Sequence, residues 1–200
     1  MKLRCYAGKR AMDIMLSVPM FVLSLPLLIP LALAVKIEDG GPVFFRQRRV
    51  GRKGRVFVAW KFRTMKAGDA EKGLGKHVAR TDPRITHVGR YLREWGIDEL
   101  PQLINVLVGD MSLVGPRPVL PAHVSQYSER QRRRLEMKPG ITGWALVNGR
   151  NTLPWRERIE LDIWYIEHWS LLLDLRILLK TLWVVLVKRE GVYGAGGLEL

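Results

Sequence analysis

The feature that most constrains this chain is an uncharged apolar run near its amino terminus. Residues 14–35 are 22 consecutive positions without a charged side chain. As a helix rising about 1.5 Å per residue, this length matches the bilayer hydrocarbon core of ~30 Å. The run therefore predicts a segment that enters lipid. A cleaved signal peptide is disfavoured, because prolines interrupt the run and the residues after it, 36–39, do not resemble a small-residue cleavage site.

Flanking charge and proline bear on whether this segment crosses the membrane. Lysine and arginine are enriched on both sides of the run, and the positive-inside tendency would place both flanks in the cytoplasm. Pro26 removes a helical hydrogen bond near the middle of the run, and Ser24 can bond a carbonyl freed in this way. We therefore expect a re-entrant helix-break-helix anchor over residues 1–38. A spanning helix with a proline kink is the alternative.

The charge of the chain indicates anionic partners. Its 33 lysines and arginines exceed its 19 acidic residues, for a formal net charge of +14. Hydrophobic residues nevertheless make up 48% of the chain, with seven tryptophans, which favours a membrane surface and argues against nucleic acid as a partner. The single cysteine, Cys5, has no partner for an intrachain disulfide and sits in no metal-ligand spacing.

Residues 39–200 are expected to form one compact α+β domain that is mostly helical. The β-forming residues of 40–65 surround a glycine-containing turn at 51–54, which predicts a small β-hairpin. The polar stretch 66–76 predicts a mobile loop, and 86–108 has helical spacing broken at Gly96. Residues 109–118 are rich in turn formers and predict a loop.

The carboxyl-terminal half predicts helices near the membrane. Residues 125–138 form a basic helix candidate, whose arginines we interpret first as a solvated surface. Tryptophan and tyrosine accumulate after Pro154, as at a membrane interface, although core packing explains several of them. Within 171–187, charged side chains including Asp174 would be costly at bilayer depth, so we expect interfacial amphipathic or core-facing helices.

Two adjacent carboxylates, Asp98 and Glu99, lie at the expected start of a helix that has Pro101 in its first turn. Acidic residues are common at helix starts, so capping is the simpler interpretation. Near a diphosphate, however, such a pair would suit Mg²⁺, which takes oxygen ligands and bridges to phosphate. An ionised aspartate beside that metal can attack phosphorus.

Basic side chains that could bind the phosphates of a substrate are spread along the chain. Arginine offers a planar fork that matches phosphate oxygens, and a proline on each side limits the backbone freedom of one of these residues. A lone surface arginine is usually only solvated, so the set gains meaning only if its members converge. The candidates are Lys61, Arg63, Arg84, Arg90, Arg117 and Arg150.

Four motifs together carry a resemblance to a known family. They are Lys-Phe-Arg-Thr-Met at 61–65, Asp-Glu-Leu-Pro-Gln-Leu-Ile-Asn-Val at 98–106, Gly-Asp-Met-Ser-Leu-Val-Gly-Pro-Arg-Pro at 109–118 and Lys-Pro-Gly-Ile-Thr-Gly-Trp-Ala at 138–145. In this order, and behind an apolar amino terminus, they resemble the bacterial sugar transferases, the monotopic phosphoglycosyl transferases. The chain looks most like their small single-domain members. Leu146 departs from the glutamine that the family often has there.

The resemblance implies an activity and a place for it. Asp98 would be the nucleophile that attacks the β-phosphate of a UDP-sugar, releasing UMP and leaving a covalent aspartyl-phosphosugar. Undecaprenyl phosphate would then take up the phosphosugar, with Mg²⁺ at Asp98 and Glu99, and Glu99 assisting as ligand or base. The enzyme would sit at the cytoplasmic face of the bacterial inner membrane with both termini cytoplasmic. From the resemblance, the sugar is expected to be an N-acetylated hexosamine derivative.

Three other functions remain open at this stage. A basic peripheral membrane adaptor without catalysis would use the carboxylate pair only as a helix start. An RNA-binding protein would explain the charge but not the apolar run. A glycosyltransferase would release UDP in place of UMP.

Overall fold

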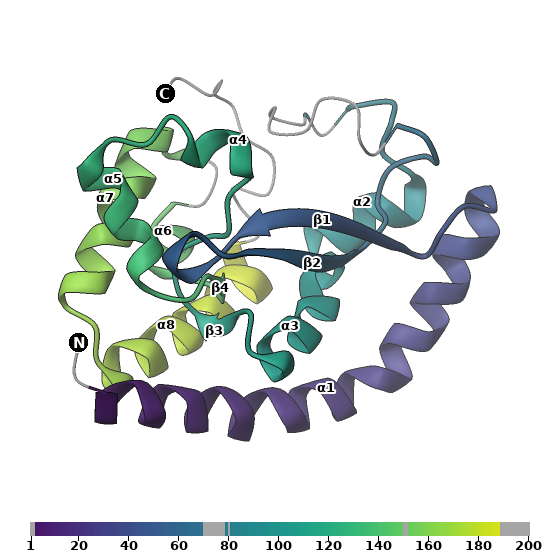
Figure 1. Ribbon diagram of the computed structural model, residues 1–200. Helices are drawn as coiled ribbons and strands as arrows, with labels where there is room; N and C mark the ends of the chain where they lie inside the picture. Colours follow the sequence, from purple (N-terminus) through teal and green to yellow (C-terminus); the bar gives the residue numbers. More distant parts are fainter. Residues whose placement is uncertain (1–2, 70–78, 80, 150–151, 189–200) are drawn as a thin grey trace.

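The computed structural model describes residues 3–69, 79, 81–149 and 152–188. Helices predominate, a two-stranded antiparallel hairpin lies on one side, and the long first helix lies on the other (Figure 1). The expected α+β class with a small hairpin is confirmed.

Helix α1 spans Leu3–Asp39 and stays helical through Pro19, Pro26 and Pro30. The sequence led us to expect a break, whereas α1 is one uninterrupted helix that bends as it passes under the domain (Figure 1). The Ser24 hydroxyl donates to the Phe21 carbonyl at 2.7 Å, one residue before the Val22 carbonyl that Pro26 leaves without its usual donor. Re-entry into the membrane stays a prediction.

The hairpin joins β1 (Phe44–Val50) to β2 (Val56–Phe62) in the register Phe44↔Phe62 through Val50↔Val56. The connecting 3₁₀ turn η1 (Arg52–Gly54) places Gly54 at φ 78°, a conformation that glycine adopts without steric cost. Phe57 and Ala59 are buried on the inner face of β2. This hairpin confirms the one predicted within residues 40–65.

The helical segment after the hairpin divides where the sequence predicted. Helix α2 (His87–Glu94) ends before Gly96, which adopts φ 66°, and the chain continues as the 3₁₀ helix η2 (Ile97–Gln102) and α3 (Leu103–Val108). The Glu38 carboxylate accepts the backbone N–H groups of His87 and Val88, which ties the end of α1 to the start of α2. Most of the predicted mobile loop, from residue 70 onward, lies outside the described residues.

A short parallel ladder crosses the centre of the domain. Strand β3 (Ser112–Val114) lies inside the stretch 109–118, which was expected to be only a loop, and pairs with β4 (Gly140–Thr142). The two backbones approach so closely that a Cβ on Gly140 would lie 2.1 Å from the Gly115 nitrogen, which requires glycine there. The remaining elements are α4 (Pro121–Val124), α5 (Glu129–Arg132), η3 (Arg133–Glu136), α6 (Trp144–Val147), α7 (Trp155–Glu167), α8 (Leu171–Trp183) and the π-helical turn η5 (Val184–Lys188).

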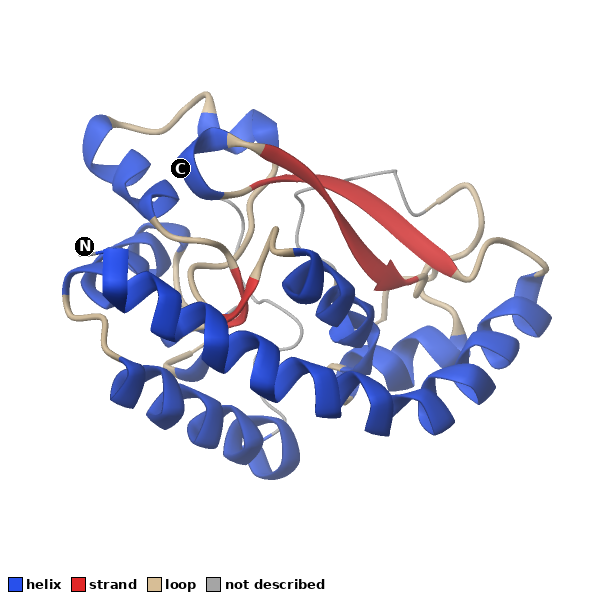
Figure 2. Ribbon diagram, turned by 60° about the horizontal axis from the view of Figure 1, so that its bottom comes forward, coloured by secondary structure: helices blue, strands red, loops and turns tan. Residues whose placement is uncertain are grey.

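A main core cluster lies between the hairpin, α3, the β3–β4 ladder, α7 and α8. It combines side chains from all of these elements: Phe57, Ala59, Leu103, Val106, Met111, Leu113, Val114, Met137, Val147, Tyr165 and Ile177. Helices α1 and α8 lie on the side of the domain opposite the hairpin (Figures 1 and 2).

A buried polar network joins α1 to this core. The Lys9 ammonium lies 2.6 Å from Asp174 on α8, and Tyr165 and Trp169 donate to the same carboxylate at 2.5 Å and 3.0 Å. One helical turn along, Asp13 accepts the Leu113 N–H at 3.0 Å. The flank of the apolar run is therefore part of the domain interior.

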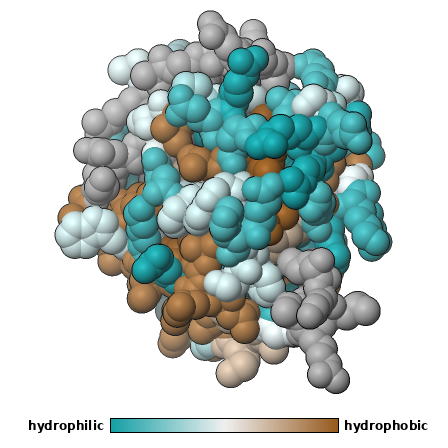
Figure 3. Space-filling view, turned by 90° about the vertical axis from the view of Figure 1, so that its left-hand side faces the viewer, coloured by the Kyte–Doolittle hydropathy of each residue, from teal (hydrophilic) through white to brown (hydrophobic). Residues whose placement is uncertain are grey.

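Apolar side chains gather on one side of the molecule. Figure 3 shows them over the lower part of one face, with hydrophilic residues above. Within the described residues, α1 supplies the one helix long and apolar enough to cross a membrane, over Ala7–Asp39. Large exposed apolar side chains on α1 and α8 include Met15, Val22, Leu23, Ile29, Leu33, Leu172, Leu175, Leu179, Leu182 and Trp183.

We predict that Asp174→Ala lowers the free energy of unfolding by about 3–5 kcal/mol, because it leaves the Lys9 ammonium buried without a counterion. Denaturant unfolding of the purified protein in detergent micelles, followed by circular dichroism, measures the loss. Glu160→Ala breaks the exposed Arg130–Glu160 pair and should leave the unfolding midpoint unchanged. Equal shifts in the two variants would contradict this account.

Candidate active site

The carboxylate pair lies at the start of η2, where the backbone N–H groups of a helix favour negative charge. Asp98 and Glu99 occupy the first turn, which begins at Ile97 after the left-handed Gly96. Helix η2 packs against β2, so the pair faces the hairpin strand that carries Lys61. The expected helix start is confirmed, although its first turns are 3₁₀ and Pro101 lies beyond the first turn.

Glu99 binds two cations from different parts of the chain. Its Oε1 atom lies 2.6 Å from Lys61 Nζ and 3.0 Å from Arg117 Nη2. Burial disfavours the charged form of Glu99, but Arg117 and Lys61 outweigh burial and lower its pKa below the ordinary value. Glu99 is therefore an ionised carboxylate that is bound by two cations.

Asp98 is in the opposite situation. Among the described residues its carboxylate has no hydrogen-bond or ion-pair partner. Burial and the adjacent Glu99 charge raise its pKa, against the influence of Lys61, Arg93 and Arg117. The environment thus moves the pKa values of the two adjacent carboxylates apart. Glu99 stays ionised and bound to two cations, while Asp98 is more basic and has no partner among the described residues.

Lys61 reaches this pair from the buried face of β2, on the side that also holds Phe57 and Ala59. Burial lowers the pKa of Lys61, and Glu99 opposes that shift. An ammonium group in this position needs a counterion, and Glu99 provides it.

Arg117 is held through its backbone by a buried ion pair. Arg134 Nη2 donates to the Arg117 carbonyl at 3.1 Å, and Asp162 accepts the Arg117 backbone N–H. Arg134 and Asp162 lie 2.6 Å apart, each almost fully buried. Arg134 also donates to the Tyr127 hydroxyl at 2.7 Å. The interpretation of residues 125–138 as a solvated arginine surface is wrong for Arg134.

Sequence reasoning missed two cations near the pair. Arg93, at the end of α2, lowers the pKa of Asp98 and donates to the Thr64 hydroxyl at 2.8 Å. Arg49 of β1 donates to the Pro118 carbonyl at 3.0 Å, and burial and Arg117 lower its pKa to about 10. The signal for Arg93 was the glycine turn at Gly96, which brings the end of α2 back beside η2.

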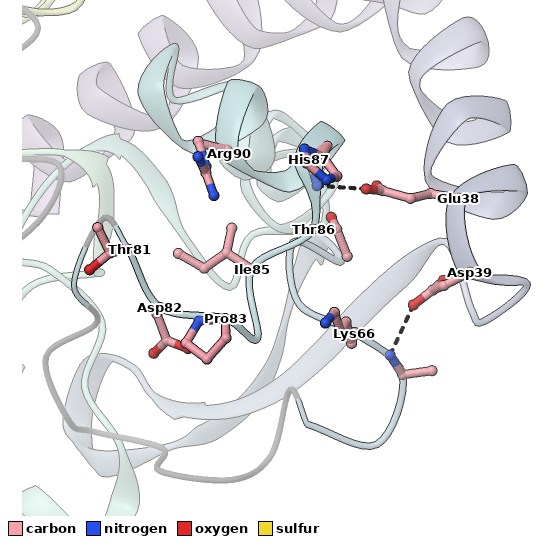
Figure 4. Close-up of a pocket in the computed structure, with 11 residues that line it drawn as sticks. Glu38, Asp39, Lys66, Thr81, Asp82, Pro83, Ile85, Thr86, His87 and Arg90 are labelled. Carbon is pink, nitrogen blue, oxygen red and sulfur yellow. Dashed lines mark hydrogen bonds between the residues drawn. The ribbon is translucent and has the colours of Figure 1, made fainter.

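The other predicted phosphate-binding residues lie elsewhere. Arg63 is buried and bonds Asp39 and the carbonyls of Pro42, Val35 and Met65, which joins β2 to the end of α1. Arg84 forms a bidentate pair with Asp82. Arg90 lines a separate cavity of about 540 Å³ between α2 and the end of α1 (Figure 4). Arg150 lies outside the described residues.

Asp98 and Glu99 are suitable ligands for a magnesium ion whose other ligands would come from substrate and water. The described residues contain no group of three or more histidine, cysteine, aspartate or glutamate side chains able to hold a metal. Mg²⁺ is typically bound by one or two carboxylates together with substrate phosphates and water. Asp98 and Glu99, beside Lys61 and Arg117, would supply the carboxylates of such a site.

We predict that Arg134→Lys lowers the free energy of unfolding by about 2–4 kcal/mol, because one ammonium cannot serve Asp162, Tyr127 and the Arg117 carbonyl together. Denaturant unfolding measures the change. Arg132→Lys, at an exposed position of the same basic run, is the matched control and should have no effect. A loss below about 1 kcal/mol for Arg134→Lys would contradict the role of Arg134 in holding the Arg117 backbone.

Comparison with known proteins identifies the family. The profile of the bacterial sugar transferases matches residues 4–188. The uncharacterized sugar transferase EpsL of Bacillus subtilis is 51% identical over 158 residues, which are 79% of this chain and 76% of that protein. The UDP-glucose:undecaprenyl-phosphate glucose-1-phosphate transferase of Escherichia coli is 46% identical over 181 residues, 86% of this chain.

The undecaprenyl-phosphate galactose phosphotransferase of Salmonella typhimurium is 43% identical over 199 residues, 92% of this chain. The chain spans 39% of the Escherichia coli relative and 41% of the Salmonella relative, so it corresponds to one part of those longer proteins. The match to the family profile extends from the apolar helix α1 to η5. This chain belongs to the bacterial sugar transferase family.

Proposed function

We propose that this protein transfers a phosphosugar from a UDP-sugar to undecaprenyl phosphate and releases UMP. The observation that carries the proposal is the asymmetry of the carboxylate pair: Glu99 is bound by Lys61 and Arg117, whereas Asp98 is uncommitted and more basic than an ordinary aspartate. A nucleophile next to a group of cations suits attack on a diphosphate, whose negative charge the cations stabilise.

The reaction proceeds in two displacements at the same phosphorus atom. An Asp98 carboxylate oxygen attacks the β-phosphorus, and the bond from that phosphorus to the bridging oxygen breaks, so that UMP leaves with the bridging oxygen. The product is an aspartyl-phosphosugar. A phosphate oxygen of undecaprenyl phosphate then attacks this phosphorus, the bond to Asp98 breaks, and the free carboxylate is restored.

The neighbouring residues would bind and orient the reactants. Lys61 and Arg117 are 2.6 Å and 3.0 Å from Glu99, so they remain close to Asp98 and can face the phosphates. Mg²⁺ held by Asp98 and Glu99 would offset the charge of two anionic reactants. Arg93, at the end of α2, adds a further positive charge near Asp98.

The apolar surface supports a site at the membrane. Exposed leucines of α1 and α8 lie on one side of the protein, opposite the hairpin, and would rest in the lipid interface. An acceptor held in the bilayer by its polyprenyl chain brings its phosphate to that interface. We place the enzyme at the cytoplasmic face of the inner membrane, where UDP-sugars are available.

The transferred sugar is the part of the proposal that rests on resemblance. The names of the two characterised relatives above specify glucose and galactose for those proteins. An N-acetylated hexosamine derivative stays our prediction for this chain, so all three classes of donor belong in the test.

We predict that wild-type protein mixed with Mg²⁺ and its UDP-sugar gains the mass of one phosphosugar, because the Asp98 adduct accumulates without acceptor. Intact-protein mass spectrometry with a panel of UDP-hexoses and UDP-N-acetylhexosamines measures the gain and identifies the sugar. Asp98→Asn should abolish the adduct and reduce UMP release at least about 1000-fold, since the amide is a poor nucleophile.

Glu94→Gln is the matched control, since it neutralises a carboxylate on the preceding helix outside the pair. It should keep the adduct. UDP in place of UMP as the released nucleotide would contradict the reaction. No adduct and no UMP with any donor, in the presence of undecaprenyl phosphate, would favour a membrane adaptor without catalysis.

We predict that both ends of α1 face the cytoplasm. Single-cysteine variants Lys2→Cys and Lys53→Cys, each in a Cys5→Ser background, should both resist a membrane-impermeant maleimide in intact cells and react after lysis. Labelling of Lys2→Cys alone in intact cells would show that α1 spans the membrane.

A further inference from the structure

One side chain closes the outer edge of β2. In a two-stranded hairpin, the edge facing away from the partner strand presents backbone groups without a ladder partner. Asn105 Nδ2 donates to the Val58 carbonyl at 2.7 Å, and Asn105 Oδ1 accepts the Trp60 backbone N–H at 3.1 Å. The carboxamide of Asn105 thus takes the place of a peptide group in a third strand.

The backbone of the same residue closes the turn after α3. The Asn105 carbonyl accepts the N–H groups of Gly109, Asp110 and Met111 at 3.0, 2.9 and 3.1 Å. This turn leads through β3 toward Arg117. Asn105 is 3% exposed, so these bonds are shielded from water.

Asn105 therefore joins the two segments that carry the Lys61–Glu99 ion pair. Lys61 directly follows Trp60 on β2, and Glu99 precedes Asn105 on the continuous η2–α3 segment. Phe57 and Leu103 belong to one apolar cluster between these elements. Apolar contact is not directional and tolerates sliding, whereas two hydrogen bonds to one strand edge determine its register.

We propose that Asn105 is a positioning residue for phosphosugar transfer, which holds β2 against the η2–α3 segment so that Lys61 reaches Glu99. This inference rests on the proposed function. Asn105 acts through Lys61, and the side chain has no suitable substitute. Aspartate would set an oxygen against the Val58 carbonyl, alanine would leave both backbone groups unpaired, and glutamine would add a methylene to a buried position.

A double-mutant cycle tests the role. Asn105→Ala should lower kcat about tenfold to a hundredfold with a smaller effect on KM, because a displaced Lys61 no longer supports the charge that develops at phosphorus. Lys61→Met should then cost at least about tenfold less in the Asn105→Ala background than in wild type, because the two changes remove the same contribution.

Ser112→Ala is the matched control. It removes a buried hydrogen bond to Asp13, 2.9 Å long, which joins α1 to β3 and does not touch β2. The fold-loss of kcat in the Ser112→Ala/Lys61→Met double variant should equal the product of the two single losses, as expected for independent sites. All variants are assayed at a temperature at which circular dichroism shows them folded. Asn105→Leu, which keeps the branched side-chain shape without a donor or acceptor, replaces Asn105→Ala if the latter does not fold.

Amide hydrogen exchange provides a readout that does not depend on activity. Exchange at the Trp60 N–H should accelerate at least about tenfold in Asn105→Ala and stay unchanged in Ser112→Ala. An active enzyme in which the losses from Asn105→Ala and Lys61→Met simply multiply, or unchanged Trp60 exchange, would overturn the positioning role. A wild-type protein inactive with every donor would instead reject the proposed function, and Trp60 exchange would still report whether Asn105 holds the strand.

Discussion

Charge compensation at Glu99 is the constraint on which the site depends. Lys61 comes from the buried face of a strand and Arg117 from a loop, and both reach the same Glu99 oxygen. Lys61 is 17% exposed, and burying its ammonium without a counterion would cost several kcal/mol. The shared oxygen therefore requires hairpin, η2 and loop to be in place together, and the site forms only in the folded domain.

Helix α1 combines an exposed apolar surface with polar side chains buried in the domain. Its exposed side chains are large and apolar, as lipid contact requires, while Lys9, Asp13 and Ser17 are buried. Two of these polar groups bond α8 and β3 directly. A segment that looks like a separable anchor in sequence is thus packed against the catalytic domain.

What could be predicted from the sequence was mostly local. The hairpin, the helix break at Gly96 and the carboxylates at a helix start follow from turn residues and periodicity within a few positions. The β3–β4 ladder was missed because each strand has three residues, too few to show a pattern. Arg134 was missed because it lies in a basic run, and its partner Asp162 is 28 positions away. Convergence of Lys61 and Arg117 on Glu99 was visible only in three dimensions.

The same geometry explains how adjacent carboxylates can divide their work. Both cations bond Oε1 of Glu99, so within the described residues Oε2 has no hydrogen-bond partner and is available to a metal. In the same part of the chain, neither oxygen of Asp98 has a hydrogen-bond partner. In the proposed reaction, Asp98 would need a free lone pair to attack phosphorus, and Mg²⁺ would need a ligand in a fixed position. Because Glu99 is held through one oxygen, its other oxygen would help to fix the proposed metal, while Asp98 would keep an oxygen free to attack phosphorus.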